Sequence, residues 1–421
     1  DFDGDGIITA NPNDSSPTGD EGGSIMSTFA PYGRDNVRDF FQNGAIFQNT
    51  LSISSGNSDG YFGLTLGSLE KEFVVADDKL SRYSALIKGG VKVNKWSFDG
   101  QVNFIRTKTS QGDPTIYHDL LQSASDVPIT KFRDYPDNAY AWSIYYTSPY
   151  YRQKHVRSNS LRNYFNVIGS AGYAFNEHIN LTYRGNMNFT NLESSNYNDG
   201  YVADLIYDGL FADIQSNYFQ SNANQQNYYG DLTLNMNYDI AKDLNLDLTL
   251  GHNYQDNRTT NSQAGGTGLL IAGLYTIPNL SNPAQPSTLN NRKFHNNVHA
   301  FIGNLDLSYK KFLFFNAAGR YEMNSSLKEL SVNNDFSYFF PSASLSFIPT
   351  KAFDFGGNVL NYLKITGAVE RTGGISAISG YQLDPIATVA AGYPYAGSGY
   401  ISYNPQTTYT DQRLNPEFTN K

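Results

Sequence analysis

The sequence predicts an all-β protein, an antiparallel transmembrane β-barrel, and three observations support this fold class. Apolar and polar residues alternate with a period of two over many segments, which is typical of strands with one apolar face. The connections between these segments alternate between short and long. No apolar run reaches the roughly 18 residues that a transmembrane helix requires, which excludes such a helix and remains compatible with a barrel that crosses lipid on short strands.

The clearest predicted hairpin covers residues 228–254. Its apolar residues share one parity and its polar residues share the other, on both sides of the short link Asp239 to Asp243. The same pattern recurs at 179–189, 301–309 and 313–322. If the apolar parity faces lipid, two sets of side chains separate: Leu181, Leu246, Leu248 and Leu305 toward lipid, and Arg184, Asp247, Asp306 and Arg320 toward the lumen.

A soluble sandwich can also show alternation, so the lengths of the connections decide between the two classes. Outer-membrane barrels have short periplasmic turns and long extracellular loops. About twelve strands are predicted, and the connections between them alternate between short and long as in such barrels. The short connections are 57–60, 94–95, 176–178, 239–243, 310–311 and 349–358, and the long ones are 71–80, 108–157, 192–225, 256–292, 328–335 and 372 onward.

Aromatic residues near the short turns give independent support. Tyr and Trp favour the boundary between lipid and water, where an apolar ring and a polar tip are both satisfied. Five aromatic residues of the apolar parity lie within a few residues of the short turns and predict one girdle; ordinary core packing is the alternative. They are Tyr173, Phe175, Tyr238, Tyr309 and Phe347.

The composition excludes several function classes. The chain has 421 residues and no Cys, which removes disulfides, thiolate metal sites and cysteine nucleophiles. Its formal net charge of −9 disfavours a nucleic-acid partner. The six His residues are scattered, the pair His295 and His299 has no carboxylate or Cys beside it in sequence, and the glycine-rich stretch 265–268 lacks the context of a nucleotide-binding loop. We therefore expect no enzyme activity and no organic cofactor.

The acidic start of the chain predicts a calcium site. Asp1, Asp3 and Asp5 precede Gly6, which matches the oxygen ligands and the turn-forming glycine of a calcium loop, although Pro12 stands where an acidic ligand is expected. Asp14, Asp20 or Glu21 could supply the missing ligand. Asp-Gly pairs that simply form turns are the alternative interpretation.

Aromatic residues in the long loops are the candidate substrate-binding residues. Amphipathic rings can stack on sugars or pack on peptides, and they can equally pack the loop itself. The candidates are Trp142, Tyr145, Tyr146, Tyr150, Tyr151 and Tyr395.

The order of several segments resembles the SusC/RagA-like TonB-dependent outer-membrane transporters, over nearly the whole chain from about Asn36 to Glu417. The strongest match is Arg320-Tyr-Glu-Met-Asn-Ser-Ser-Leu327 followed by Tyr338-Phe-Phe-Pro-Ser-Ala-Ser-Leu-Ser-Phe347. Leu363 to Gly373 and Leu414-Asn-Pro-Glu417 close the resemblance. Phe132-Arg-Asp-Tyr-Pro136 and Thr147-Ser-Pro-Tyr-Tyr151 resemble the first long loop, where the family more often has Asn in place of Ser148.

The resemblance implies a segment of a large, 22-stranded, plugged barrel in the bacterial outer membrane. Residues 1–43 would form an extracellular loop with the calcium site, and residues 44–421 the strands, with the plug domain absent from the segment. The implied function is TonB-dependent import of a bulky nutrient, an oligosaccharide first and an oligopeptide second.

The implied partners are a SusD-like lipoprotein lid and the TonB-ExbB-ExbD complex, which would act through the absent N-terminal region. The isolated segment is not expected to transport by itself. A siderophore or cobalamin transporter, a passive porin and a soluble carbohydrate-binding β protein are the alternatives.

Overall fold

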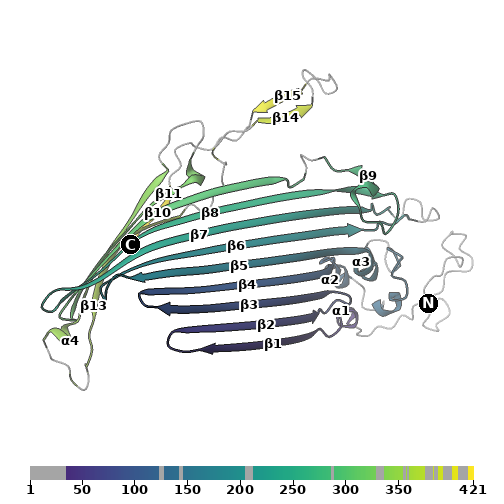
Figure 1. Cartoon of the computed structure of the whole chain (residues 1–421). Helices are drawn as coiled ribbons and strands as arrows, with labels where there is room; N and C mark the ends of the chain where they lie inside the picture. Colours follow the sequence, from purple (N-terminus) through teal and green to yellow (C-terminus); the bar gives the residue numbers. More distant parts are fainter. Residues whose placement is uncertain are drawn as a thin grey trace, which may run out of the picture.

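The structure is a computed structural model, and one antiparallel sheet of 14 strands dominates it. It describes residues 35–122, 128–141, 146–203, 212–285, 289–328, 336–353, 357, 360–374, 383 and 416–421, and the backbone alone for 387–391 and 401–405. Asp1, Asp3, Asp5, Trp142, Tyr145 and Tyr395 lie outside the described residues. The sheet order is β1 to β8, then β10 to β13, then β16, with β9 paired to β8 (Figure 1).

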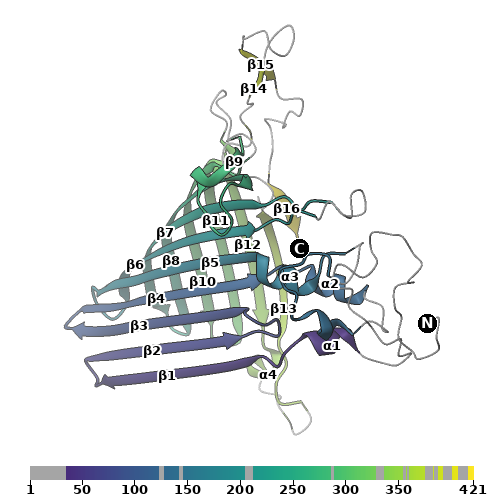
Figure 2. The same ribbon diagram turned by 90° about the vertical axis from the view of Figure 1, so that its right-hand side faces the viewer.

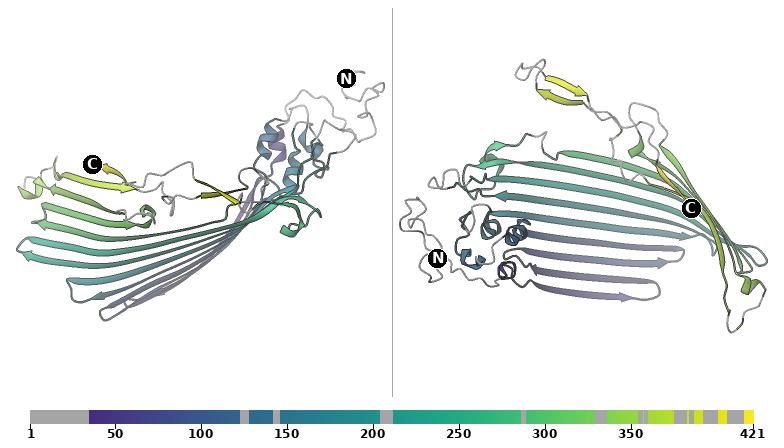
Figure 3. Two further views of the ribbon diagram at one scale, coloured as in Figure 1. Left: turned by 90° about the horizontal axis from the view of Figure 1, so that it is seen from above. Right: turned by 180° about the vertical axis from the view of Figure 1, so that it is seen from behind.

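Neighbours in the sheet are almost all neighbours in the sequence, which is the meander expected of an up-and-down barrel wall. The strand ribbon curves into an open trough, and it does not close on itself within the described residues (Figures 2 and 3). A separate hairpin is formed by β14 (Ala387–Ala391) and β15 (Ile401–Pro405). The main strands are β1 (Ala45–Gly56), β2 (Gly60–Glu72), β3 (Lys79–Val93), β4 (Trp96–Gly112), β5 (Val156–Ala174), β6 (Ile179–Asn198), β7 (Asn217–Ala241), β8 (Leu244–Leu269), β9 (Leu280–Pro283), β10 (Arg292–Tyr309), β11 (Leu313–Asn324), β12 (Ser337–Phe347), β13 (Ile365–Gly374) and β16 (Glu417–Asn420).

As far as β12, short connections at one end of the strands alternate with longer ones at the other end (Figure 1). The β12–β13 connection, predicted to be short at 349–358, instead covers 348–364 and contains a helix at Pro349–Ala352. Three of the short connections have a left-handed backbone, and in the β10–β11 connection Lys310 and Lys311 adopt it. Asn94 between β3 and β4 has φ 55°, and Asp243 between β7 and β8 has φ 68°. Asn and Asp tolerate this conformation better than most residues, so their places in the sequence fit two-residue hairpin turns.

The strands are longer than the alternation of residues indicates. The predicted loops 192–225 and 256–292 contain strand residues of β6 up to Asn198, of β7 from Asn217 and of β8 up to Leu269. Those loop predictions were therefore wrong at their boundaries. The extensions are mostly polar, with only scattered apolar residues such as Leu192 and Phe219, so the hydrophobic period disappears. The backbone ladder continues because each neighbouring strand extends as well.

The predicted parity is confirmed by the register. Leu305 pairs with Leu248, and Asp306 pairs with Asp247 directly beside it. Directly opposed residues in an antiparallel pair point to the same face, so the sheet has one apolar face and one polar face. Leu181 joins the apolar face through Leu234 and Leu250, and Arg184 joins the polar face through Asp231.

Short helices gather at the end of the strands that bears the long connections (Figure 1). Their apolar side chains form a small buried cluster with Phe40, Ile116, Leu120, Ile129, Phe132 and Tyr150 at its centre. The helices are α1 (Asn36–Phe40), α2 (Ile116–Leu121), η1 (Ile129–Phe132) and α3 (Pro149–His155), while η3 (Ile277–Asn279), η5 (Ser325–Leu327) and α4 (Pro349–Ala352) lie elsewhere in the chain. The helix α1 falls within residues 1–43, for which only a loop was predicted.

Candidate functional site

The apolar face of the sheet is exposed and ends in two rows of aromatic residues. The lower row lies at the short turns and contains the predicted girdle residues; there Tyr173 packs against Trp96 and Phe175 with ring centroids 4.7 and 4.9 Å apart. The upper row was not predicted. In it Phe165 packs against Phe189 at 6.4 Å, and Phe189 packs against Tyr228 at 5.7 Å. The upper row also contains Phe104, Phe301, Tyr321 and Phe339, all on the apolar parity.

The distance between the two rows matches the thickness of a membrane. On β7 the rows are represented by Tyr228 and Tyr238, ten positions apart. At about 3.3 Å per residue this is roughly 33 Å along the strand, or about 25 Å along the membrane normal at a tilt near 40°. Exposed apolar residues fill the interval, among them Leu51, Ile87, Tyr183, Leu232 and Leu250.

Beyond the upper row the same face becomes polar. On β6 Phe189 is followed on that parity by Asn191 and Glu193, and on β4 Phe104 is followed by Arg106 and Lys108. The sequence signal for the upper row was this change from aromatic to polar residues at a constant parity.

The opposite face of the sheet is rich in amides and charged groups that bond to one another. The Asn166 amide donates to the side-chain oxygens of Asn186 at 2.7 Å and Asn188 at 2.6 Å. Asn316 donates to Asp306 at 2.7 Å. Such a surface presents both donors and acceptors to a polar solute.

A hollow of about 380 Å³ lies on this polar face near the ends of β11 and β13, lined in part by Arg320, Glu322, Phe340 and Thr372. Arg320 binds Glu322 through Nε at 2.7 Å and Nη2 at 2.6 Å. A half-buried ion pair beside an aromatic ring is suited to hydroxyl, amide or charged groups of a ligand. The lumen parity of Arg320 was predicted, but its place in a hollow was not, because the hollow needs Thr372 from a different strand.

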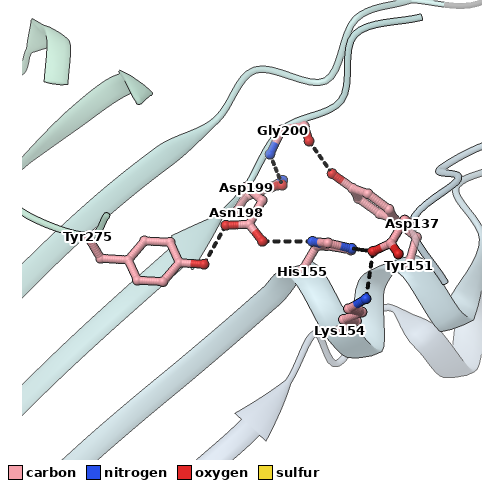
Figure 4. Close-up of polar contacts among 8 residues, drawn as sticks. All are labelled: Asp137, Tyr151, Lys154, His155, Asn198, Asp199, Gly200 and Tyr275. Carbon is pink, nitrogen blue, oxygen red and sulfur yellow. Dashed lines mark hydrogen bonds and ion pairs between the residues drawn. The ribbon is translucent and has the colours of Figure 1, made fainter. Parts of the chain in front are cut away.

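The long connections are held together by His155, which lies between two carboxylates (Figure 4). Its Nδ1 is 2.7 Å from Asp199 Oδ2, and its Nε2 is 2.7 Å from Asp137 Oδ1. Lys154 donates to Asp137 at 2.7 Å, and this bond and that of His155 hold the pKa of Asp137 below its usual value. The contacts join α3 and Asp137, which both belong to the β4–β5 connection, to Asp199 in the β6–β7 connection.

Tyrosine hydroxyls extend the same network to a third connection (Figure 4). Tyr275, in the β8–β9 connection, donates to Asp199 at 2.5 Å and stacks on Tyr197 with centroids 3.8 Å apart. Burial and the bond to Asp199 raise the pKa of Tyr275. Tyr151 donates to the carbonyl of Gly200 at 2.6 Å, and its ring stacks on His155. The network therefore ties the β4–β5, β6–β7 and β8–β9 connections to one another.

A second set of ion pairs fastens α2 and α3 to the strand ends. Arg152 binds Asp113 at 2.7 Å and Asp119 at 2.5 Å. Burial raises the pKa of Asp119, against the opposing effect of Arg152. Arg157 binds Asp78 at 2.8 Å, with only 7% of the arginine exposed.

The candidate substrate-binding tyrosines have differing surroundings. Tyr150 is buried against Phe40, with ring centroids 5.0 Å apart, and Tyr151 is 1% exposed, so a substrate would have to displace protein contacts to reach either ring. Tyr146 is half-buried. Substrate contact by these residues stays a prediction.

The histidine pair and the glycine-rich stretch considered in the sequence form no common site in the part of the chain that the structure describes. His295 binds Asp256 at 3.1 Å, while His299 contacts His252 and Tyr254, so the two histidines have different partners. The glycine-rich stretch 265–268 was expected to be a loop and instead belongs to β8. Among the described residues no group of three or more acidic or histidine side chains could hold a metal ion.

Comparison with known proteins supports the fold. No protein-family model matches the chain, and no curated protein matches its sequence. The RagAB peptide transporter matches with a TM-score of 0.70 at 15% identity, over 93% of this chain and 43% of that chain. The RagAB peptide importer in its "open-open" state matches with a TM-score of 0.70 at 16% identity, over 42% of that chain. In its "closed-closed" state it matches with a TM-score of 0.69 at 16% identity, over 43% of that chain.

The chain has the fold of the RagAB transporter barrel. This confirms the predicted resemblance and the predicted fold class at the level of the fold. The chain spans less than half the length of the chains in these three RagAB structures. No helix in the described part is long and apolar enough to cross a membrane.

Proposed function

We propose that the chain forms part of the wall of an outer-membrane importer for a bulky polar nutrient. The observation that carries the proposal is the pair of aromatic rows about 25 Å apart, with an apolar band between them and an amide-rich face behind. In this arrangement the apolar face contacts lipid, the polar face lines the lumen, and the long connections lie outside the cell.

The proposed substrate is an oligosaccharide, because the lumen face offers many neutral donors and acceptors. An oligopeptide is the second candidate, favoured by the similarity in fold to a peptide transporter. Energy would come from a TonB complex, and a SusD-like lipoprotein would cover the long connections. The proposed role is transport, with no catalytic step.

Uptake assays separate these alternatives. Cells that express the intact protein are expected to accumulate labelled oligosaccharides only when TonB and the lipoprotein are present. Accumulation that survives loss of TonB would indicate a passive pore. Accumulation of labelled peptides in place of glycans would select the second candidate, and recovery of the protein without detergent would contradict the membrane location.

The hollow beside Arg320 gives a sharper test. We expect Arg320→Ala to lower uptake about tenfold at equal protein levels, because it removes a charged donor and leaves Glu322 unpaired in the lumen. The matched control is Tyr321→Phe on the lipid-facing side of the same strand, which should retain the parent rate. Equal uptake by both variants would remove the hollow from the transport path.

We also propose that Asp1, Asp3 and Asp5 bind calcium in a connection outside the barrel. Replacing Asp3 and Asp5 with Ala should abolish bound calcium, measured by elemental analysis of the purified protein, and leave assembly of the barrel unchanged. Replacement of Asp14 and Asp20 tests whether those residues complete the site. Unchanged calcium content in the Asp3 and Asp5 variant would refute the site.

A further inference from the structure

The lipid-facing side of the sheet carries a groove just beyond the upper aromatic row. The groove has a volume of about 610 Å³ and crosses β4 to β8. Two cations, Arg106 and Lys108, line its β4 side. They follow Phe104 of the aromatic row at two and four positions on the same parity, so they lie roughly 7 and 13 Å farther along the strand.

The two cations are available to a ligand. Both are exposed, and neither belongs to the ion pairs formed among the described residues. The acidic residue of the groove, Glu193, is aligned with Lys108 across the intervening Leu161. Two strand spacings, about 10 Å, therefore separate the backbones of Lys108 and Glu193, and the β4 side of the groove remains positive.

Apart from Glu193, the polar residues in the remainder of the groove are neutral hydrogen-bonding groups. Asn159, Gln220 and Asn222 supply amides, and Ser195 and Ser262 supply hydroxyls. Thus a cationic end lies next to the aromatic row, and a polar floor, in which Glu193 is the acidic group, extends away from it. This order matches a head group with phosphate nearest the membrane and sugar hydroxyls beyond.

The groove is continuous with a surface that would receive acyl chains. Below the aromatic row a second hollow of about 760 Å³ crosses β3 to β6, three of whose strands also line the groove, and it is bordered by Val91, Phe98, Val167 and Met187. Both hollows lie on the face that the proposed function places against lipid. A ligand with acyl chains below and a phosphorylated sugar above would contact both.

We propose that this groove binds the head group of a phosphorylated glycolipid of the surrounding membrane, with Arg106 and Lys108 on the phosphate. The inference rests on the proposed membrane location. Exposed cations in water gain little from an isolated anion, but at a membrane interface an amphiphile is held nearby by its chains, which favours such a contact. The bound lipid would hold strands β4 to β8 in one orientation relative to the bilayer.

The test is native mass spectrometry of the intact protein in detergent, with phosphorylated lipid A and enzymatically dephosphorylated lipid A as probes. We expect the parent to retain the phosphorylated form about tenfold more strongly. The double variant Arg106→Gln/Lys108→Gln should lose this preference. The control Lys293→Gln removes a cation from the same face on β10, outside the groove, and should keep it.

Equal retention of both probes by the parent, or a preference that survives in the double variant, would overturn the proposal. So would an equal loss of preference in the Lys293 control, since that result would indicate attraction to the whole face. Fractionation of the same variants separates this failure from failure of the proposed function: a protein absent from the outer membrane contradicts the function, and a membrane-resident protein without lipid preference contradicts only the groove.

Discussion

Replacing Leu248 with Arg is expected to destabilise the assembled barrel by about 2–4 kcal/mol. Leu248 lies in the apolar band, aligned with Met236 on one neighbouring strand and Leu305 on the other. A guanidinium at this position would lose water without gaining a partner, because the band around it is apolar. Snorkelling cannot fully relieve the cost near the centre of the band.

The measurement is the urea midpoint of the folded protein in lipid, together with its amount in the outer membrane. Thr249→Arg is the matched control, because Thr249 is the next residue on the same strand and faces the lumen, where it bonds Asn235 at 2.9 Å. The control should lose no more than about 1 kcal/mol. Equal stability of the Leu248 variant and the parent would show that the assignment of faces is wrong.

The sequence was sufficient to predict the hairpins and their faces, because both follow from local features. A period of two over 228–254 sets which side chains share a face, and the turn at Asp243, together with the register shift between Asp239 and Ala241, sets the pairing. The lower aromatic row was predictable for the same reason, since each of its members lies close to a short turn.

The strand extensions could not be predicted in this way. Residues Asn191 to Asn198 and Asn217 to Asn224 are mostly polar and lack a regular apolar period, and they pair with each other through backbone bonds that any side chain allows. Nothing in the composition of either segment distinguishes such a strand from a loop. The pairing becomes evident only when both strands are placed side by side.

The network of polar contacts around His155 could not be predicted, because the residues that meet in it are distant in sequence. His155 meets Asp199 across 44 positions, and Tyr275 meets Asp199 across 76. Aromatic residues there were interpreted as candidates for substrate contact, while Tyr150 is packed in the apolar cluster around Phe40 and Tyr151 against His155. A tyrosine in a loop sequence carries no information about which side of its ring is covered.

The second large effect is expected from Arg157→Ala. This variant should destabilise the packing of the long connections around Arg157 by about 3–5 kcal/mol. The Arg157 guanidinium donates to Asp78 Oδ1 at 2.8 Å, to the Asp77 carbonyl at 2.9 Å and to Ser110 Oγ at 3.0 Å. It thereby joins the β2–β3 connection to β4 and β5. Removal of the cation would leave the Asp78 carboxylate nearly buried, with the Gly112 amide at 2.7 Å as its remaining donor.

Hydrogen exchange would measure this loss as faster exchange in residues 73–80 and 149–157, with the strands between the aromatic rows unchanged. Lys154→Ala is the control, because its ion pair with Asp137 is exposed and should contribute under about 1 kcal/mol. The defect should also depend on pH. Burial already raises the pKa of Asp78 above its ordinary 3.8, and loss of Arg157 removes an interaction that lowers it.

A carboxyl whose pKa is raised on folding binds its proton more tightly in the folded state, so acidification stabilises the folded form. The difference between Arg157→Ala and the parent is therefore expected to shrink as the pH falls toward 3.8, where the Asp78 carboxyl of the variant is neutral and no longer needs a cation. Asp78→Asn in the Arg157→Ala background should reproduce that recovery at neutral pH, because the amide keeps an oxygen for Gly112 without a charge. If the defect is the same at both pH values and is not relieved by Asp78→Asn, the connection is held by packing of the arginine stem, and the buried charge is not its cause.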